Sequence, residues 1–271
     1  MNESLTARLR IKPGQHVKLA RHDPDFTGPF TNKKDAKDAT KKNLDKLFEL
    51  QYKMYAENKH SLLVVLQAMD TAGKDGLIRH VMTGMNPQGC HVTSFKKPSE
   101  RELDQDYLWR IHQAVPAKGE VGIFNRSHYE DVLVVRVHDL VPKTVWSKRY
   151  EEINQFEHYL ASTGMTIVKI FLHISKNEQK QRLQARLDDP LKHWKFSPAD
   201  LGERKHWNEY MRAYEDALSK CSTPHAPWYV IPANEKWFRN YAVSQILVDT
   251  MSRLRMSWPK PTFDPKDIKI V

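Results

Sequence analysis

The sequence has few cysteines and no long apolar run. Its 271 residues include only two cysteines, Cys90 and Cys221, which lie far apart and lack C-x-x-C spacing. This argues against a disulfide-stabilised scaffold and a structural zinc site, and it fits a reducing compartment. Residues 1–14 contain no apolar signal-peptide core, and no apolar segment is long enough to span a bilayer. We therefore expect a cytoplasmic protein with no membrane partner.

The sequence also lacks internal repeats, low-complexity tracts and Gly/Ser-rich linkers. Hydrophobic residues make up 40% of the chain and charged residues 28%, with a mean hydropathy of -0.67. This composition is typical of a globular protein rather than a disordered or membrane protein. Because the chain is also long enough to bury a substantial core, we predict a single folded domain over residues 1–271.

Positive charge is in excess. Lys and Arg number 43 against 33 Asp and Glu, which gives a net charge of +10 and a pI near 9.4. Such a balance favours a polyanionic partner: nucleic acid, an anionic membrane or a phosphate-rich substrate. The sequence shows no recognition helix, zinc finger or RNA-binding strand motif with paired aromatics. We therefore do not expect a nucleic-acid partner.

Apolar runs and amphipathic segments alternate along the chain. Residues 61–69 form a nearly continuous apolar run with adjacent valines, which is typical of a strand buried on both faces of a parallel sheet. Further strands are predicted at 91–95, 121–125, 165–174 and 228–232, and helices at 32–58, 77–85, 99–115, 142–162, 177–187, 199–219 and 236–254. This order predicts an α/β fold, a three-layer doubly wound parallel sheet with right-handed crossovers.

Prolines are frequent at both ends. Residues 1–31 contain three prolines and scattered charge, and we expect an extended N-terminal arm. Residues 257–271 also contain three prolines, and we expect a C-terminal tail that forms a strap over the surface.

The first predicted strand leads into a candidate phosphate loop, Asp70-Thr-Ala-Gly-Lys-Asp-Gly76, which is followed by a helix. Backbone N–H groups of such a turn point at an anion, and the lysine, Lys74, reaches the outer phosphates. Compared with the Walker A pattern G-x-x-x-x-G-K-[ST], Ala68 replaces the first glycine and Asp75 replaces the magnesium-binding hydroxyl. An ordinary strand-to-helix turn with a capping aspartate is therefore the alternative.

Asp70 and Asp75 flank Lys74. Carboxylates beside a phosphate cradle are compatible with anion binding when a divalent cation lies between them and the phosphates. The loop therefore predicts a Mg²⁺ site, which Mn²⁺ could also occupy.

A second candidate motif, Asn125-Arg-Ser-His-Tyr-Glu-Asp131, follows the strand at 121–125. Ligands of open α/β sheets bind outside the carboxyl ends of the strands. If this strand neighbours the first, Asn125 and Arg126 lie beside the loop, and Arg126 becomes a bidentate phosphate clamp. The alternative is a surface arginine at the start of a helix.

Arginines also mark a candidate lid. Arg182 and Arg186 share one helix face at i and i+4. Three more cations follow in a proline-interrupted segment: Lys192, Lys195 and Arg204. The pattern favours a basic helical lid over about 176–205 that closes on a phosphate chain, with an ordinary solvated helix as the alternative.

Taken together, these motifs resemble those of the family 2 polyphosphate kinases. The resemblance runs in collinear order from about Pro24 to Leu254 and includes the loop 68–76, Asn86-Pro-Gln-Gly89, Asp106-Tyr-Leu-Trp-Arg-Ile-His112, Phe124-Asn-Arg-Ser-His-Tyr-Glu130 and Trp194-Lys-Phe196. It implies a thymidylate-kinase-like P-loop fold and Mg²⁺-dependent transfer of a terminal phosphoryl group between inorganic polyphosphate and a nucleotide. The motif at 125–131 is most similar to class III members, which phosphorylate both AMP and ADP.

The resemblance also implies roles for individual residues. The catalytic set is Asp70, Lys74, Arg126 and Arg182. The polyphosphate-binding set is Ala72, Gly73, Lys74, Asp75, Gly76, Arg126, Arg182 and Arg186. Asn125 replaces a carboxylate that usually binds metal, so the expected metal ligands are Asp70 and Glu130. The nucleotide-binding set, Asn86, Phe95, Arg110 and Glu130, is predicted from position alone, near residues 84–89 and 98–109, where nucleoside monophosphate kinases bind the acceptor. A core role is the alternative for Phe95.

The implied partners are inorganic polyphosphate and adenine or guanine nucleotides, and the implied assembly is a homodimer or homotetramer. One other enzyme class fits the same motifs, an ATP-dependent nucleoside monophosphate kinase with the same fold.

Overall fold

Five parallel strands form the central sheet in the order β2-β3-β1-β4-β5. The computed structural model describes residues 4–83 and 85–270, so Gly84 of the predicted acceptor region lies outside the described residues. The strands are β1 (Ser61–Ala68), β2 (Cys90–Ser94), β3 (Val121–Asn125), β4 (Met165–His173) and β5 (Trp228–Pro232). The predicted strands are confirmed to within a residue or so at each end, and the predicted fold class is confirmed with them.

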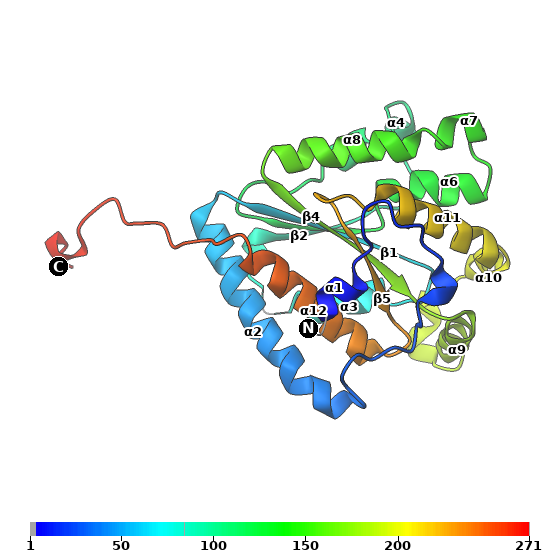
Figure 1. The fold of residues 1–271 in the computed structure, drawn as a ribbon, viewed down its shortest axis with the longest axis horizontal. Coiled ribbons are helices and arrows are strands. Elements are labelled where there is room, and N and C mark those ends of the chain that lie inside the picture. Colours follow the sequence, from blue (N-terminus) through cyan, green and yellow to red (C-terminus); the bar gives the residue numbers. More distant parts are fainter. Residues whose placement is uncertain (1–3, 84, 271) are drawn as a thin grey trace.

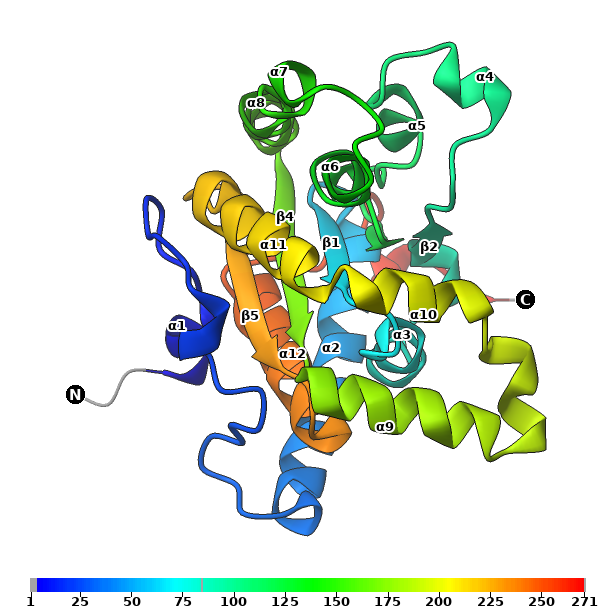
Figure 2. The same ribbon diagram turned by 90° about the vertical axis from the view of Figure 1, so that its right-hand side faces the viewer.

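Helices cover both faces of the sheet, which gives the three layers (Figures 1 and 2). One face packs against α2 (Lys33–Glu57), α3 (Lys74–Val81) and α12 (Lys236–Ser252), and the other against α6 (Val134–Val137), α8 (Arg149–Ser162) and α11 (Trp207–Cys221). Every residue of β1 is buried as a result. This explains its uninterrupted apolar sequence, since a strand covered on both faces has no polar side.

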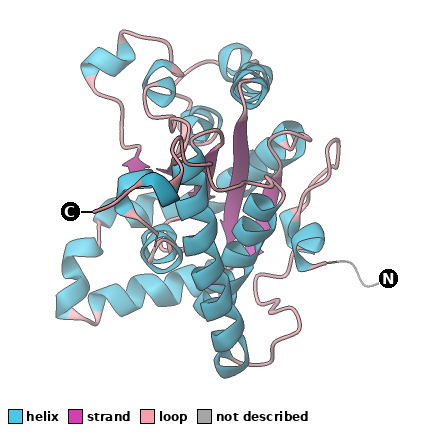
Figure 3. Ribbon diagram, turned by 90° about the vertical axis from the view of Figure 1, so that its left-hand side faces the viewer, coloured by secondary structure: helices cyan, strands magenta, loops and turns pink. Residues whose placement is uncertain are grey.

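The shorter helices lie around the edges of the sheet and near its carboxyl ends. They are α1 (Leu5–Leu9), α4 (Glu100–Leu103), α5 (Trp109–His112), α7 (Lys143–Trp146), α9 (Lys176–Leu187) and α10 (Pro198–Lys205). Short 3₁₀ helices complete the elements: η1 (Leu19–Arg21), η2 (Pro87–Gly89), η3 (His128–Val132), η4 (Pro190–Lys195) and η5 (Pro265–Asp267). Figure 3 shows the helices and loops that surround the strands.

Three predicted helices are each divided in two. The helix predicted at 99–115 consists of α4 and α5, because the Asp106 carboxylate accepts the Leu108 N–H at 2.9 Å and so competes with helical hydrogen bonding. Those predicted at 142–162 and 199–219 are divided into α7 with α8 and α10 with α11. The helix predicted from Leu77 begins at Lys74 instead, directly after the left-handed Gly73.

The N-terminal segment, predicted as an extended arm, packs against the sheet. It contains α1, and the Ile11 N–H donates to the Trp228 carbonyl of β5 at 2.9 Å. Ile11 and Val17 are fully buried. The segment therefore covers the exposed edge of β5, which would otherwise present unpaired backbone groups.

The C-terminal tail also differs from the expected strap. Ser257 contacts the Glu57 carboxylate, and the Trp258 ring lies 5.6 Å from that of Tyr52 on α2. Beyond this point the chain runs away from the sheet (Figure 1), and Ile270 is 99% exposed. In the described part of the chain, no helix is long and apolar enough to cross a membrane.

Candidate active site

A cavity of about 930 Å³ opens at the carboxyl ends of β1 and β3. Its walls come from residues 70–79, from the ends of β2 and β3, from α9 and from the start of α12; η4 and the start of α10 complete it. Ten of its lining residues are cationic: Lys74, Arg79, Lys96, Lys97, Arg126, Arg182, Arg186, Lys192, Lys195 and Lys236. Three are acidic: Asp70, Asp75 and Asp200. Much of the excess positive charge of the chain is therefore gathered in one place.

The phosphate loop connects β1 to α3. Thr71 has φ 65° and Gly73 has φ 101°, so the chain takes left-handed conformations there, at a low cost only for glycine. The Lys74 Nζ donates to the Ala68 carbonyl at 3.0 Å, and the side chain lines the cavity. Burial lowers the pKa of Lys74 against the opposing effect of the Asp70 carboxylate. Lys74 is therefore placed to bind an anion in the cavity.

Arg126 lies beside this loop because β1 and β3 are neighbours, with Leu66 opposite Asn125. Its φ is 64°, its N–H donates to the Leu66 carbonyl, and its guanidinium lies 3.1 Å from Asp70 Oδ1. Burial works against the charged form, but the Glu130 and Asp70 carboxylates raise the pKa of Arg126. The predicted adjacency of the two motifs is confirmed.

The two predicted metal ligands occupy different places. Asp70 lines the cavity, whereas Glu130 does not, and it lies 3.8 Å from Arg126 Nη1 as the partner of that guanidinium. Asn125 donates to Asp75 Oδ1 at 2.8 Å. Within residues 4–83 and 85–270, no group of three or more His, Cys, Asp or Glu side chains could hold a metal. Asp70 and Asp75 nevertheless offer the donors that suit Mg²⁺, which is typically held by one or two carboxylates together with substrate phosphates and water.

Arg182, predicted as a catalytic and polyphosphate-binding residue, lines the cavity, but its donors are directed at the protein itself. Its side chain is only 8% exposed, and its Nε donates to Glu178 at 2.6 Å. Its Nη atoms donate to four backbone carbonyls, those of Thr71, Ala72, Ala233 and Asn234, at 2.6–3.1 Å. Because these contacts use its donors, Arg182 stabilises the backbone of the loop.

A second buried arginine, Arg239 on α12, has no counterpart among the predictions. It is 3% exposed and donates to the carbonyls of Ala72 and Gly73 at 3.3 and 3.2 Å. No motif marks it, because it lies inside an ordinary amphipathic helix far from the loop in sequence. Only the packing of α12 against α3 brings it to the site.

The predicted lid, 176–205, is helical and flanks α3 (Figure 2). Arg186 lines the cavity and contacts the Lys195 carbonyl at 2.7 Å and Asp200 at 3.4 Å. Arg204 donates to the Lys176 carbonyl and to Gln179, which joins α10 to α9. Lys192 and Lys195 line the cavity from η4.

The predicted nucleotide residues are only partly brought together. Phe95 lines the cavity, and the Arg110 guanidinium lies 5.4 Å from the centre of its ring. Arg110 and Asn86 are absent from the described cavity lining, and Asn86 instead caps η2 through the Gln88 N–H. Of the four predicted residues, Phe95 alone lines the cavity, and Arg110 lies over the Phe95 ring.

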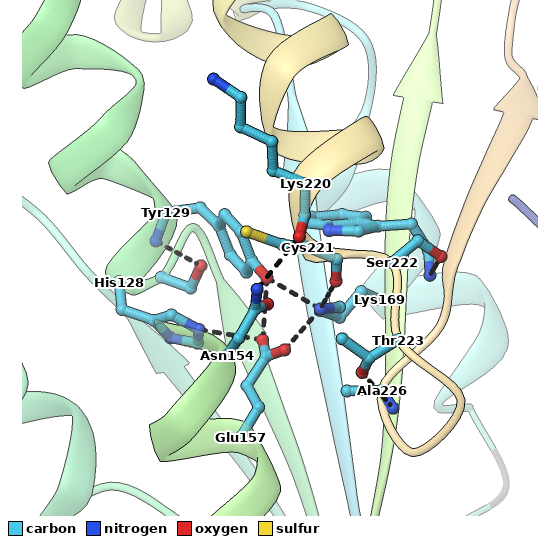
Figure 4. A network of polar contacts seen from close by, with 12 residues as sticks. His128, Tyr129, Asn154, Glu157, Lys169, Lys220, Cys221, Ser222, Thr223 and Ala226 are labelled. Carbon is cyan, nitrogen blue, oxygen red and sulfur yellow. Dashed lines mark hydrogen bonds and ion pairs between the residues drawn. The ribbon is translucent and has the colours of Figure 1, made fainter. Parts of the chain in front are cut away.

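A buried polar network supports the second motif (Figure 4). Lys169 is fully buried and donates to Glu157 at 2.5 Å, to the Tyr129 hydroxyl at 2.8 Å and to the Cys221 carbonyl at 2.6 Å. The other Glu157 oxygen contacts His128 and accepts from Tyr129. Burial works against the charged form of Glu157, but Lys169 lowers the pKa of the carboxyl. The network fixes η3 two residues beyond Arg126.

A parallel sheet whose central strand leads through a glycine-lysine loop into a helix, beneath a cationic lid, defines a P-loop-type phosphotransferase. The chain belongs to the polyphosphate kinase 2 family, whose model matches residues 31–257. Kinases of this family generally need a divalent metal.

Individual relatives support this assignment along nearly the whole chain. The AMP/ADP-polyphosphate phosphotransferase of Meiothermus ruber is 55% identical over 94% of this chain and 96% of its own length. The ADP-polyphosphate phosphotransferase of Rhodopseudomonas palustris is 45% identical over 95% and 93%. The crystal structure of polyphosphate kinase 2 from Arthrobacter aurescens superposes with a TM-score of 0.94, at 48% identity, over 97% of this chain and 94% of that chain.

Proposed function

We propose that this kinase transfers the terminal phosphoryl group of inorganic polyphosphate to AMP and to ADP, forming ADP and ATP reversibly, as a class III member of its family. The observation that carries the proposal is the cavity in which ten cationic residues surround the loop at Lys74. A linear polyanion is the ligand that such a lining suits best. The names of the Meiothermus ruber and Rhodopseudomonas palustris relatives support the same pair of substrates.

Phosphoryl transfer depends mainly on positioning and charge neutralisation. In our proposal a terminal phosphate oxygen of the nucleotide attacks the end phosphorus of the chain, one P–O bond forms, and the bond to the bridging oxygen breaks in line. Lys74 and Arg126 offset charge on the transferred group, and the N–H groups at the start of α3 hold its oxygens. No covalent enzyme intermediate is involved.

Asp70 would hold the divalent metal, Mg²⁺ or Mn²⁺, together with phosphate oxygens and water, and Asp75 of the same cavity lining would assist. When bound, the metal supplies positive charge to the phosphate oxygens. Glu130 acts through Arg126, whose guanidinium it orients.

The lid and the nucleotide side complete the proposal. Arg186, Lys192 and Lys195 bind the phosphate chain and limit the access of water when the lid covers it. Phe95 and Arg110 lie where they can contact an adenine or guanine nucleotide, at the end of β2. We propose a cytoplasmic homodimer or homotetramer with neither nucleic acid nor membrane as a partner.

The test is an assay with AMP and ADP as separate acceptors, polyphosphate as the only donor, and Mg²⁺, with products separated by chromatography. We expect ADP and ATP to form. An ATP-dependent nucleoside monophosphate kinase would form ADP from AMP and ATP and give no product from polyphosphate. Absence of product from polyphosphate with both acceptors would refute the proposal.

A further inference from the structure

Arg239 packs against the backbone of the phosphate loop, and it is not among the described residues that line the cavity. Its Nη1 is 3.3 Å from the Ala72 carbonyl oxygen and 3.2 Å from that of Gly73. The Asn240 Oδ1 accepts from its Nε at 3.1 Å and from its Nη2 at 2.8 Å. A Cβ added to Gly73 would lie 2.1 Å from Nη1, so the guanidinium and the loop backbone are in close contact.

The contacts of Arg239 orient the loop peptides. The described peptide bonds are trans, and in a trans peptide the C=O and N–H groups point in opposite directions. The Ala72 carbonyl accepts hydrogen bonds from Arg182 and Arg239, and the Gly73 carbonyl accepts one from Arg239. The N–H groups of Gly73 and Lys74, which belong to the same two peptides, therefore point away from Arg239, and both residues line the cavity.

Arg239 is also a buried positive charge without a local anion. In the described part of the chain no carboxylate forms an ion pair with it, and it is 3% exposed. Burial and the neighbouring charge of Arg182 lower the pKa of Arg239 to about 10. A buried cation is costly unless an anion compensates it. A phosphate bound in the cavity, which Gly73 and Lys74 of the same loop line, would supply that anion.

We propose that Arg239 is a positioning residue for polyphosphate binding. It holds the Ala72 and Gly73 carbonyls so that the next two N–H groups face the phosphate, and it places a positive charge under the bound anion. The inference rests on the proposed function, because it takes polyphosphate as the anion.

Three variants separate positioning and charge from simple packing. Arg239→Met removes both the donors and the charge, and Arg239→Lys keeps the charge and fewer donors. Asn240→Asp keeps the accepting oxygen but places a compensating negative charge beside the guanidinium. Ser252→Asp is the matched control, since it adds the same charge to an exposed position of α12 about 18 Å along the helix.

The measurements are calorimetric binding of inorganic polyphosphate, the separate KM and kcat values, and thermal unfolding with and without polyphosphate. We expect Arg239→Met and Asn240→Asp each to raise the Kd and KM for polyphosphate by about tenfold or more, and to reduce the polyphosphate-induced rise in Tm. Arg239→Lys should recover part of the affinity, and the KM for the nucleotide and the Ser252→Asp control should change little.

Wild-type polyphosphate affinity in both Arg239→Met and Asn240→Asp would overturn the inference, even if their Tm without ligand falls. If Arg239→Met does not fold, Asn240→Asp decides alone, because it retains the guanidinium and its contacts. A wild-type protein that does not bind polyphosphate would instead overturn the proposed function together with this inference.

Discussion

Two groups of cations in this molecule have opposite surroundings. Arg182, Arg239 and Lys169 are buried, and their donors are used by oxygens of the protein itself, although Arg182 also borders the cavity. Arg126 and Lys192 line the cavity, with side chains 43% and 52% exposed. The first group holds the loop and the second motif in place, whereas the second group remains accessible to a ligand. The net charge of +10 does not distinguish these two roles.

The largest effect is expected from breaking the most deeply buried cation. Lys169→Met leaves Glu157 charged, buried and without its main partner, which costs roughly 3–5 kcal/mol of unfolding free energy. Urea denaturation measures this loss, and adding Glu157→Leu should recover much of it. A loss below about 1 kcal/mol would show that the pair does not support the fold.

Lys74→Ala probes the cavity group, and its effect should fall on catalysis. Removing the cation at the transferred phosphate is expected to lower kcat by about 10²- to 10³-fold, with an unchanged circular dichroism spectrum. Lys118→Ala, an exposed lysine outside the cavity lining, is the matched control. Near-normal turnover of Lys74→Ala would remove this residue from the mechanism.

A smaller effect is expected from the lid. Arg186→Ala should raise the KM for polyphosphate about tenfold, with little change in the Tm, because this arginine lines the cavity and contributes few contacts to the core. Arg212→Ala, which is 61% exposed on α11, is the comparison variant. Equal KM values for the two variants would contradict a ligand-binding role for Arg186.

The sequence predicts the sheet better than the helices. Strands such as β1 have a continuous apolar signal that depends only on local burial, and β3 and β5 match their predicted bounds. Helix ends depend on single hydrogen bonds from side chains to the backbone, such as that of Asp106, which periodicity does not detect. The packing of the N-terminal segment could not be predicted from its local sequence, because it depends on the distant edge of β5.

The candidate site shows the same difference between local signals, which the sequence reveals, and tertiary contacts, which it does not. Lys74, Asp70 and Arg126 follow strands directly, so topology alone brings them together. The role of Arg182 depends on which atoms its guanidinium meets after folding, and Arg239 reaches the loop only through the packing of α12. A local sequence pattern marks the position of an arginine, but it does not reveal whether the arginine contacts the ligand or the backbone beneath it.

The most direct test of whether the cavity cations bind the phosphate chain is the salt dependence of catalysis. The KM for polyphosphate and the KM for ADP are measured from low to high NaCl concentration. If the cavity cations bind a long polyanion, the KM for polyphosphate rises much more steeply with salt than the KM for ADP, because more screened contacts are lost. Equal salt dependence of the two KM values would contradict a cavity that binds the phosphate chain.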